Sequence, residues 1–221
     1  MEYRYDLHVH TSEVSACGSI PAKEVVRLYH QAGYDGLVIT DHYADYFFQK
    51  MPNLSWEDKL SRYLAGYEIA KDAAKNCGLS IFLGMELRLS GPVPNEYLIF
   101  GIDTEFLLRK KELYQMELPE VRGLVHDSRG LLFQAHPFRK GMQQRPGEVD
   151  GLEVFNGNQR HNSHNDLSYQ LAKTKNLLMC SGSDFHELED LAVGGIITKE
   201  RITNSAQLVK ALKNQEFTLI K

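Results

Sequence analysis

Apolar residues occur along the chain in short, nearly continuous runs, separated by longer stretches in which they recur at helical spacing. The short runs are rich in Val, Ile, Leu and Phe and lie next to Gly, Asp or Asn, a pattern typical of buried strands. Strands are therefore predicted at residues 5–9, 36–40, 80–87, 97–102, 131–135, 151–155, 177–181, 193–197 and 217–220.

The stretches between these runs have the character of amphipathic helices. In the first, Val25 and Tyr29 share one face and Gly33 follows as a stop. The second opens with Ser55 and Asp58, whose spacing resembles a capping box. Helices are predicted at residues 21–31, 55–76, 118–128, 165–175 and 205–213.

Strands and helices alternate along the chain, which predicts an α/β fold with a largely parallel sheet. Right-handed crossovers then allow either a barrel or a doubly wound sheet. The sequence contains no repeat, low-complexity tract or long linker, so residues 1–221 are expected to form a single domain.

The composition narrows the possible partners and surroundings. Hydrophobic residues make up 43% and charged residues 24% of the chain, which excludes disordered and fibrous classes. The net charge of -4 argues against a nucleic-acid partner without excluding one, but it allows an anionic substrate beside bound cations. Cys17, Cys77 and Cys180 are too widely spaced to suggest a disulfide framework. Without an apolar run of ~20 residues or a signal-like N-terminus, the protein is expected in the cytoplasm, away from membranes.

Side chains able to bind metals gather at the carboxyl ends of the predicted strands. In β/α barrels, active sites form at this end of the strands. Any one of these residues could be an ordinary buried histidine or acid, but independent core residues have no reason to recur at equivalent strand ends. They are His8, His10, Asp41, His42, Glu86, His136, Glu153, Asp184 and His186.

The first strand illustrates the chemistry. His8 and His10 project to the same side and can reach one metal, and Asp6 shares that side and could orient an imidazole. Mixed imidazole and carboxylate ligands suit Zn, Mn or Fe. Because more such groups are present than one tetrahedral ion requires, two or three divalent metal ions are predicted, with Glu86 or Asp184 able to bridge them.

Several segments, taken in order, resemble the motif pattern of the PHP (polymerase and histidinol phosphatase) domain family. The resemblance extends from residue 6 to about residue 197 and implies a distorted (β/α)7 barrel with metal-dependent phosphoesterase activity. The segments are Asp6-Leu7-His8-Val9-His10-Thr11, Ile39-Thr40-Asp41-His42, Gly84-Met85-Glu86, Ala135-His136-Pro137 and Gly182-Ser183-Asp184-Phe185-His186.

The resemblance also implies roles for individual residues. It makes His8, His10 and Asp184 ligands of a first metal, with Glu86 as a bridging ligand. It also implies that His42 and His186 face a second metal and the phosphate, and that His136 binds a third metal. The expected catalytic residues are His42, Asp184 and His186.

Two positions depart from the family pattern. Many members carry Asp or His a few residues after the H-x-H segment, where this chain has residues 13–18. Glu13 is the expected substitute ligand and Cys17 the second choice. Many members also carry His on the strand after the glutamate, and here Glu96 is expected to take that role.

A phosphate ester requires positive charge beyond the metals, and arginine can hold it with two hydrogen bonds. Arg139 and Arg160 are the expected substrate ligands, ahead of Arg88. Asn156 is expected to contact substrate or to orient a ligand, and Glu153 to orient a ligand rather than to bind metal.

The leading hypothesis is therefore hydrolysis of a small phosphate ester, a phosphomonoester or a nucleotide, by metal-activated hydroxide at a di- or trinuclear site. His42 or His186 would neutralise the developing charge or protonate the leaving group. Two alternatives remain open. One is an amidohydrolase-like metal hydrolase, and the other is a non-catalytic, metal-stabilised interaction module.

Overall fold

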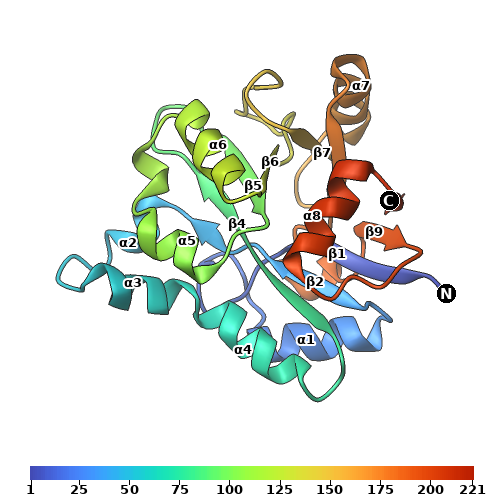
Figure 1. Ribbon diagram of the computed structural model, residues 1–221, viewed down its shortest axis with the longest axis horizontal. Helices are drawn as coiled ribbons and strands as arrows, with labels where there is room; N and C mark the ends of the chain where they lie inside the picture. The colour runs from blue at the N-terminus through green and yellow to red at the C-terminus, as the bar shows by residue number, and fades with distance from the viewer.

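The computed structural model describes residues 1–221, and its ten-stranded sheet curves into a nearly closed barrel with the helices outside it (Figure 1). The strand order is β10-β9-β1-β2-β4-β5-β6-β7-β8, and the short β3 pairs with β4. The strands are β1 (Tyr3–Val9), β2 (Gly36–Ile39), β3 (His42–Tyr43), β4 (Ser80–Arg88), β5 (Glu96–Phe100), β6 (Leu131–Gln134), β7 (Gly151–Asn156), β8 (Leu178–Gly182), β9 (Gly195–Thr198) and β10 (Phe217–Ile220).

The sheet is more mixed than the alternation of elements predicts. Parallel pairs join β1 to β2, β2 and β3 to β4, β6 to β7, and β7 to β8. However, β5 runs antiparallel to both β4 and β6, and β9 runs antiparallel to β1 and β10. The chain passes from β4 to β5 through a short loop without a helix, and such a connection can join only antiparallel strands.

Eight α-helices surround the barrel, and none of them combines the length and apolar character needed to cross a bilayer. The helix predicted at 55–76 is two helices, which meet at Leu64. The short α2 and α5 were not predicted, because so few residues show no helical periodicity. The helices are α1 (Ala22–Gln31), α2 (Asp45–Phe48), α3 (Trp56–Tyr63), α4 (Ala65–Ala74), α5 (Thr104–Arg109), α6 (Leu118–Asp127), α7 (Asn165–Lys175) and α8 (Ser205–Asn214).

Buried apolar residues fill both sides of the sheet. One cluster joins side chains from strands around the barrel, among them Tyr5, Phe82 and Phe133, to Leu208 and Leu212 of α8. Two others pack helices on the outside: α1 and α4 against β1 and β2, and α3, α5 and α6 against β4 to β7. This packing fixes the strands, and with them the residues at their carboxyl ends.

The segment that follows β8 closes the barrel against β1. Val9 and Phe185 form a parallel bridge, and the N–H of His10 donates to the carbonyl of Phe185 at 3.1 Å. Gly182 permits this approach, because a Cβ there would lie 2.3 Å from the Cβ of His8. The closure brings Asp184, which has a left-handed backbone (φ 52°), beside the imidazoles of β1.

Candidate metal centre

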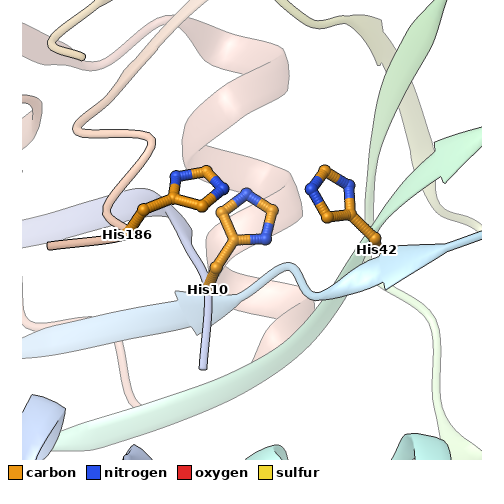
Figure 2. A group of neighbouring side chains, drawn as sticks. All are labelled: His10, His42 and His186. Carbon is orange, nitrogen blue, oxygen red and sulfur yellow. The ribbon is translucent and has the colours of Figure 1, made fainter. Parts of the chain in front are cut away.

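Five buried imidazoles from different strand ends converge at one end of the barrel. The ring of His10 lies 4.2 Å from that of His186 and 4.5 Å from that of His42, measured between centroids, and Figure 2 shows these three rings together. His8 lies 5.0 Å from His10 and 5.9 Å from His136. The structure therefore brings together the five histidines that were expected at one site.

The carboxylate of Glu86 lies among four of these imidazoles. Its Oε1 is 3.2 Å from Nε2 of His8 and 3.0 Å from Nε2 of His136. Its Oε2 is 2.9 Å from Nδ1 of His42 and 3.4 Å from Nε2 of His10. A carboxylate surrounded in this way can bridge neighbouring cations.

Two further carboxylates border the same space. Oδ1 of Asp184 lies 3.4 Å from Nε2 of His8 and 3.3 Å from Nε2 of His10. Glu96 approaches from the other side, with Oε2 3.6 Å from Nε2 of His136 and Oε1 3.9 Å from Nδ1 of His42. Glu96 is thus placed where a ligand was expected.

The unsatisfied atoms of this cluster fit divalent cations. Buried polar atoms normally have hydrogen-bond partners, but several here have none. They are Nε2 of His8, Nε2 of His10, Nδ1 of His42, Nδ1 of His136 and Oε2 of Glu86. Three groups have ligand atoms within 4.8 Å of one another: His8, His10 and Asp184; His10, His42 and His186; and His42, Glu86 and Glu96.

Hydrogen bonds to the outer ring nitrogens direct lone pairs into this space. Nδ1 of His8 lies 2.8 Å from Oε1 of Glu153, and a carboxylate can only accept, so His8 donates there and its Nε2 is free for a metal. Glu153 thereby orients a ligand, as its sequence position suggested. Nδ1 of His186 likewise lies 2.8 Å from the backbone carbonyl of Asp184.

His10 is oriented through Ser15, a residue that the sequence analysis missed. The hydroxyl of Ser15 donates to Oδ1 of Asp41 at 2.7 Å, so its oxygen accepts from Nδ1 of His10 at 3.1 Å. Asp41 also accepts from the backbone and hydroxyl of Thr11. No local sequence pattern marks Ser15, because its role depends on a loop that brings it to Asp41 and His42, just after β2.

Asp6 does not orient an imidazole, contrary to the sequence expectation. The register of β1 against β2 shifts between Asp6 and Val9, so the simple alternation of side chains is interrupted. The Asp6 carboxylate instead accepts from the hydroxyls of Tyr29 and Ser183 and from the backbone of Ser183. It fixes the segment after β8, and burial, which outweighs these hydrogen bonds, raises its pKa to about 6.

The structure also places Glu13 elsewhere than expected. Both oxygens of its carboxylate accept from the backbone N–H of Ala22, at 3.1 and 3.0 Å, at the start of α1. Cys17, the second choice, lies at the site instead, with Sγ 3.2 Å from Nε2 of His42. Burial opposes ionisation of this thiol, but hydrogen bonds with His186 and His42 outweigh it and lower its pKa to about 6.

Without a cation, the charges of the cluster are strongly coupled. Burial disfavours the protonated ring of His8, but the charges of Asp184, Glu153 and Glu86 outweigh this and hold its pKa well above the usual value. Burial likewise opposes ionisation of Asp184, yet His8 and other nearby positive groups hold its pKa well below the usual value. Protons and metal ions therefore compete for the same atoms, and metal binding must release protons.

Arg139 and Asn156 converge on Asp184. Nη2 of Arg139 donates to Oδ2 of Asp184 at 2.7 Å, to Oδ1 of Asn156 at 3.0 Å and to Oγ of Ser163 at 3.3 Å. Nδ2 of Asn156 donates to the same Oδ2 at 3.2 Å. These bonds hold Oδ2, leave Oδ1 facing the imidazoles, and leave the rest of the Arg139 guanidinium available to an anion.

Arg160, the other arginine expected to bind substrate, is engaged elsewhere. It holds Asp190 with two hydrogen bonds, from Nη1 to Oδ1 at 2.9 Å and from Nη2 to Oδ2 at 2.8 Å. Asp190 in turn accepts from the backbone N–H of His186 at 2.9 Å. Arg160 therefore fixes the segment that carries His186, although it also borders the cavity.

A cavity of about 290 Å³ opens onto the cluster. Its lining is almost entirely polar, with residues from the ends of several strands. They include Cys17, His42, Glu86, Glu96, His136, Arg139, Asn158, Arg160, His161, Asp184 and His186.

A barrel with this cluster at its strand ends defines a class of protein, the metal-dependent hydrolases. A model of the PHP domain matches residues 6–190. The chain belongs to the PHP domain family. No curated protein matches it.

Solved structures with the same fold have 17% sequence identity to this chain. A two-domain protein from Bacteroides vulgatus, containing a predicted PHP-like metal-dependent phosphoesterase, has a TM-score of 0.69; the match covers 99% of this chain and 64% of that one. PsfC from Pseudomonas syringae has a TM-score of 0.65, with coverages of 93% and 86%. An amidohydrolase from Chromobacterium violaceum, with bound sulfate and no metal, has a TM-score of 0.58, with coverages of 94% and 96%. At this identity the likenesses show a shared fold.

Proposed function

We propose that this protein is a metal-dependent phosphoesterase, which hydrolyses a small phosphomonoester or nucleotide with two or three divalent ions, Zn, Mn or Fe. The observation that carries the proposal is the set of buried, unpartnered imidazole and carboxylate atoms beside Arg139. Metals would balance the carboxylates, and the guanidinium would bind an anion. This combination suits a phosphate ester.

The donor set supports the proposed number of ions. A neutral imidazole has one lone pair for a metal, so neither His10 nor His42 can serve both of the groups in which it lies. Glu86 has two oxygens that face different imidazoles, so it can serve more than one ion. Two or three ions can therefore be accommodated.

Bound divalent ions would supply Lewis acidity and activate water at neutral pH. The protein orients the reactants around them. Arg139 faces the cavity and would bind a phosphate oxygen, while Asn156 keeps the Asp184 carboxylate in place. His42, His186 and Asp184 are the proposed catalytic residues because they border the space that the scissile bond would occupy.

The size and lining of the cavity suit a small phosphorylated compound as the partner. About 290 Å³ is at the lower end of the range for ligand pockets, and the lining is polar rather than apolar. His161 lies at the mouth of this cavity. Partial burial and the charge of Arg139 lower its pKa, so its ring can donate or accept a hydrogen bond without adding charge.

Phosphate release tests the proposal. The chain is stripped of metal, reloaded with Mn, Zn or Fe, and assayed against a panel of phosphomonoesters and nucleotides. Turnover that requires added metal is expected, and it should disappear in His8→Ala and Asp184→Ala. His30→Ala, a change at an exposed histidine on α1, is the matched control. Fully loaded protein that hydrolyses none of these esters would exclude the proposal.

The amidohydrolase-like alternative has one specific observation in its favour, the structural likeness to the amidohydrolase from Chromobacterium violaceum. The same metal-loaded preparations should therefore be assayed with small amide substrates. Hydrolysis of amides but not of esters would favour that alternative. If the metal-loaded chain hydrolyses neither esters nor amides, and His8→Ala and Asp184→Ala change only its stability, the protein acts as a metal-stabilised interaction module.

A further inference from the structure

Cys17 is held at the site by a loop that is fixed at both ends. On one side, Ser15 is bonded to Asp41, and the N–H of Gly18 donates to the carbonyl of Ser15 at 2.9 Å. On the other side, both the backbone N–H and the hydroxyl of Ser19 donate to the carbonyl of His186, at 2.9 and 3.2 Å. The position of the thiol is therefore determined by the same residues that hold the imidazoles.

The thiol faces a group of three imidazoles, which includes a ring nitrogen without a hydrogen-bond partner. His10, His42 and His186 bring ligand atoms within 4.8 Å of one another, and all three side chains are buried. Nε2 of His10 has no hydrogen-bond partner and is buried. This group indicates a cation independently of the cysteine, and the cysteine lines the same cavity.

The spacing between Cys17 and His42 is that of two ligands on one ion. Zn–S bonds of ~2.3 Å and Zn–N bonds of ~2.0 Å at a tetrahedral angle separate sulfur and nitrogen by ~3.5 Å. The observed separation between Sγ and Nε2 is 3.2 Å. Only a small movement is needed for both atoms to bind the same metal.

We propose that Cys17 binds one of the divalent ions as a thiolate, together with Nε2 of His42 and the imidazole of His186. With Nε2 on the metal, the proton of His42 remains on Nδ1, which faces Oε2 of Glu86 at 2.9 Å. Glu86, Glu96 and His136 are left to hold a neighbouring ion. This inference rests on the proposed function only in that both require bound ions.

The ligand type has a consequence for the metal. Thiolate is a soft ligand that favours Zn over Mn or Mg, whereas carboxylate favours the harder ions. Cys17 therefore gives one position of the site a softer metal preference than Glu86, Glu96 and Asp184 give the rest of it. Zn is the ion that this position selects.

Replacement with Co(II) tests the inference through a spectroscopic signal. Thiolate bound to Co(II) gives a charge-transfer band in the near ultraviolet, which imidazole and carboxylate ligands do not give. The Co(II)-loaded chain should show this band, and Cys17→Ser and Cys17→Asp should lose it. Cys77→Ser, at a partly buried thiol outside the site, should retain it as the matched control. In Cys17→Asp, the ratio of Mn to Zn bound under competition should rise at least tenfold.

A second measurement uses the unsubstituted chain and does not depend on the folding of a variant. Zn should slow alkylation of Cys17 by iodoacetamide, as followed by peptide mapping, and should leave Cys77 unchanged. If Co(II)-loaded protein lacks the band and Zn gives Cys17 no protection, the inference is overturned, even if phosphate esters are hydrolysed. If the band and the protection are present without ester hydrolysis, the inference holds and the proposed function fails.

Discussion

His8 and Glu153 form a 2.8 Å hydrogen bond between two fully buried side chains, one at the end of β1 and the other in β7. The carboxylate fixes the proton of His8 on Nδ1 and so turns Nε2 toward Glu86 and Asp184. The bond therefore links two strands that are far apart in the sequence to the orientation of one ligand. Several consequences of this arrangement can be measured.

Glu153→Gln should weaken metal binding. The amide can donate as well as accept, so it no longer enforces the tautomer of His8, and loss of such a partner typically costs ~10–100-fold in metal affinity. Titration of the metal-free chain against a chromophoric chelator measures the change. Glu120→Gln, at an exposed position on α6, is the control. Equal affinities for the two variants would show that this hydrogen bond does not govern binding.

Ser15→Ala should have a similar effect through His10. Removal of the hydroxyl breaks the connection between Nδ1 of His10 and Asp41, and it leaves the buried carboxylate without one donor. A decrease in metal affinity of about tenfold or more is expected. Ser12→Ala, at an exposed position in the same loop, should bind metal like the unchanged chain. A normal affinity in Ser15→Ala would exclude the proposed orientation of His10.

The two arginines should differ in their effects on catalysis. Arg139→Met removes a donor to the anion and also the hydrogen bond to Asp184, so kcat/KM should fall by about 10²-fold or more. Arg160→Met should cost less, because both of its charge-assisted bonds go to Asp190. Steady-state kinetics with the best phosphate ester measures both. If Arg160→Met lowers kcat/KM more than Arg139→Met does, Arg160 rather than Arg139 is the main ligand of the anion.

Metal removal should make the stability of the folded chain sensitive to alkaline pH. The pKa of His8 is raised in the folded chain, because Asp184, Glu153 and Glu86 outweigh the effect of burial. Its protonated ring therefore stabilises the metal-free fold fully below an unfolded pKa of about 6.5, and this contribution is lost as pH rises through the folded value.

Calorimetry of metal-free and Zn-loaded protein measures this difference. The Tm of the metal-free protein should decrease as the pH rises above about 6.5, while that of the Zn-loaded protein should change less, since a metal-bound His8 carries no such proton. The pKa of Asp6 is raised to about 6, so Asp6 affects stability over a lower pH range. It does so in both the metal-free and the Zn-loaded protein. If the Tm of the metal-free protein rises with pH instead, protonation of His8 does not stabilise the fold as described.

The sequence predicted nine of the ten strands, all but the two-residue β3, because each of the nine contains a short apolar run between polar residues; residues 217–220 agree with β10 at both ends. That the candidate metal ligands lie close together could also be expected, since strand ends place them at one end of a barrel. Side-chain direction was less predictable. Because of the register shift in β1, the side chains of Asp6 and His8 point in different directions. Periodicity alone cannot indicate such a bulge.

The loop after β1 was the least predictable part of the site. Glu13, Ser15 and Cys17 lie within a few residues of one another, and each could reach a metal in an extended chain. Their actual directions depend on bonds to Ala22 at the start of α1 and to Asp41 and His42, which are distant in sequence. Because loop geometry is set by such tertiary contacts, the sequence could name the candidates but could not choose among them.

Imidazoles and carboxylates from separate strands are proposed to share bound cations. Crystals soaked with Mn or Zn and inorganic phosphate test it directly through anomalous diffraction. At least two anomalous peaks are predicted in contact with Glu86, one of them also with His8, His10 and Asp184, and phosphate density is predicted beside Arg139. A map without anomalous peaks among these side chains, at metal concentrations that support hydrolysis, would contradict the account.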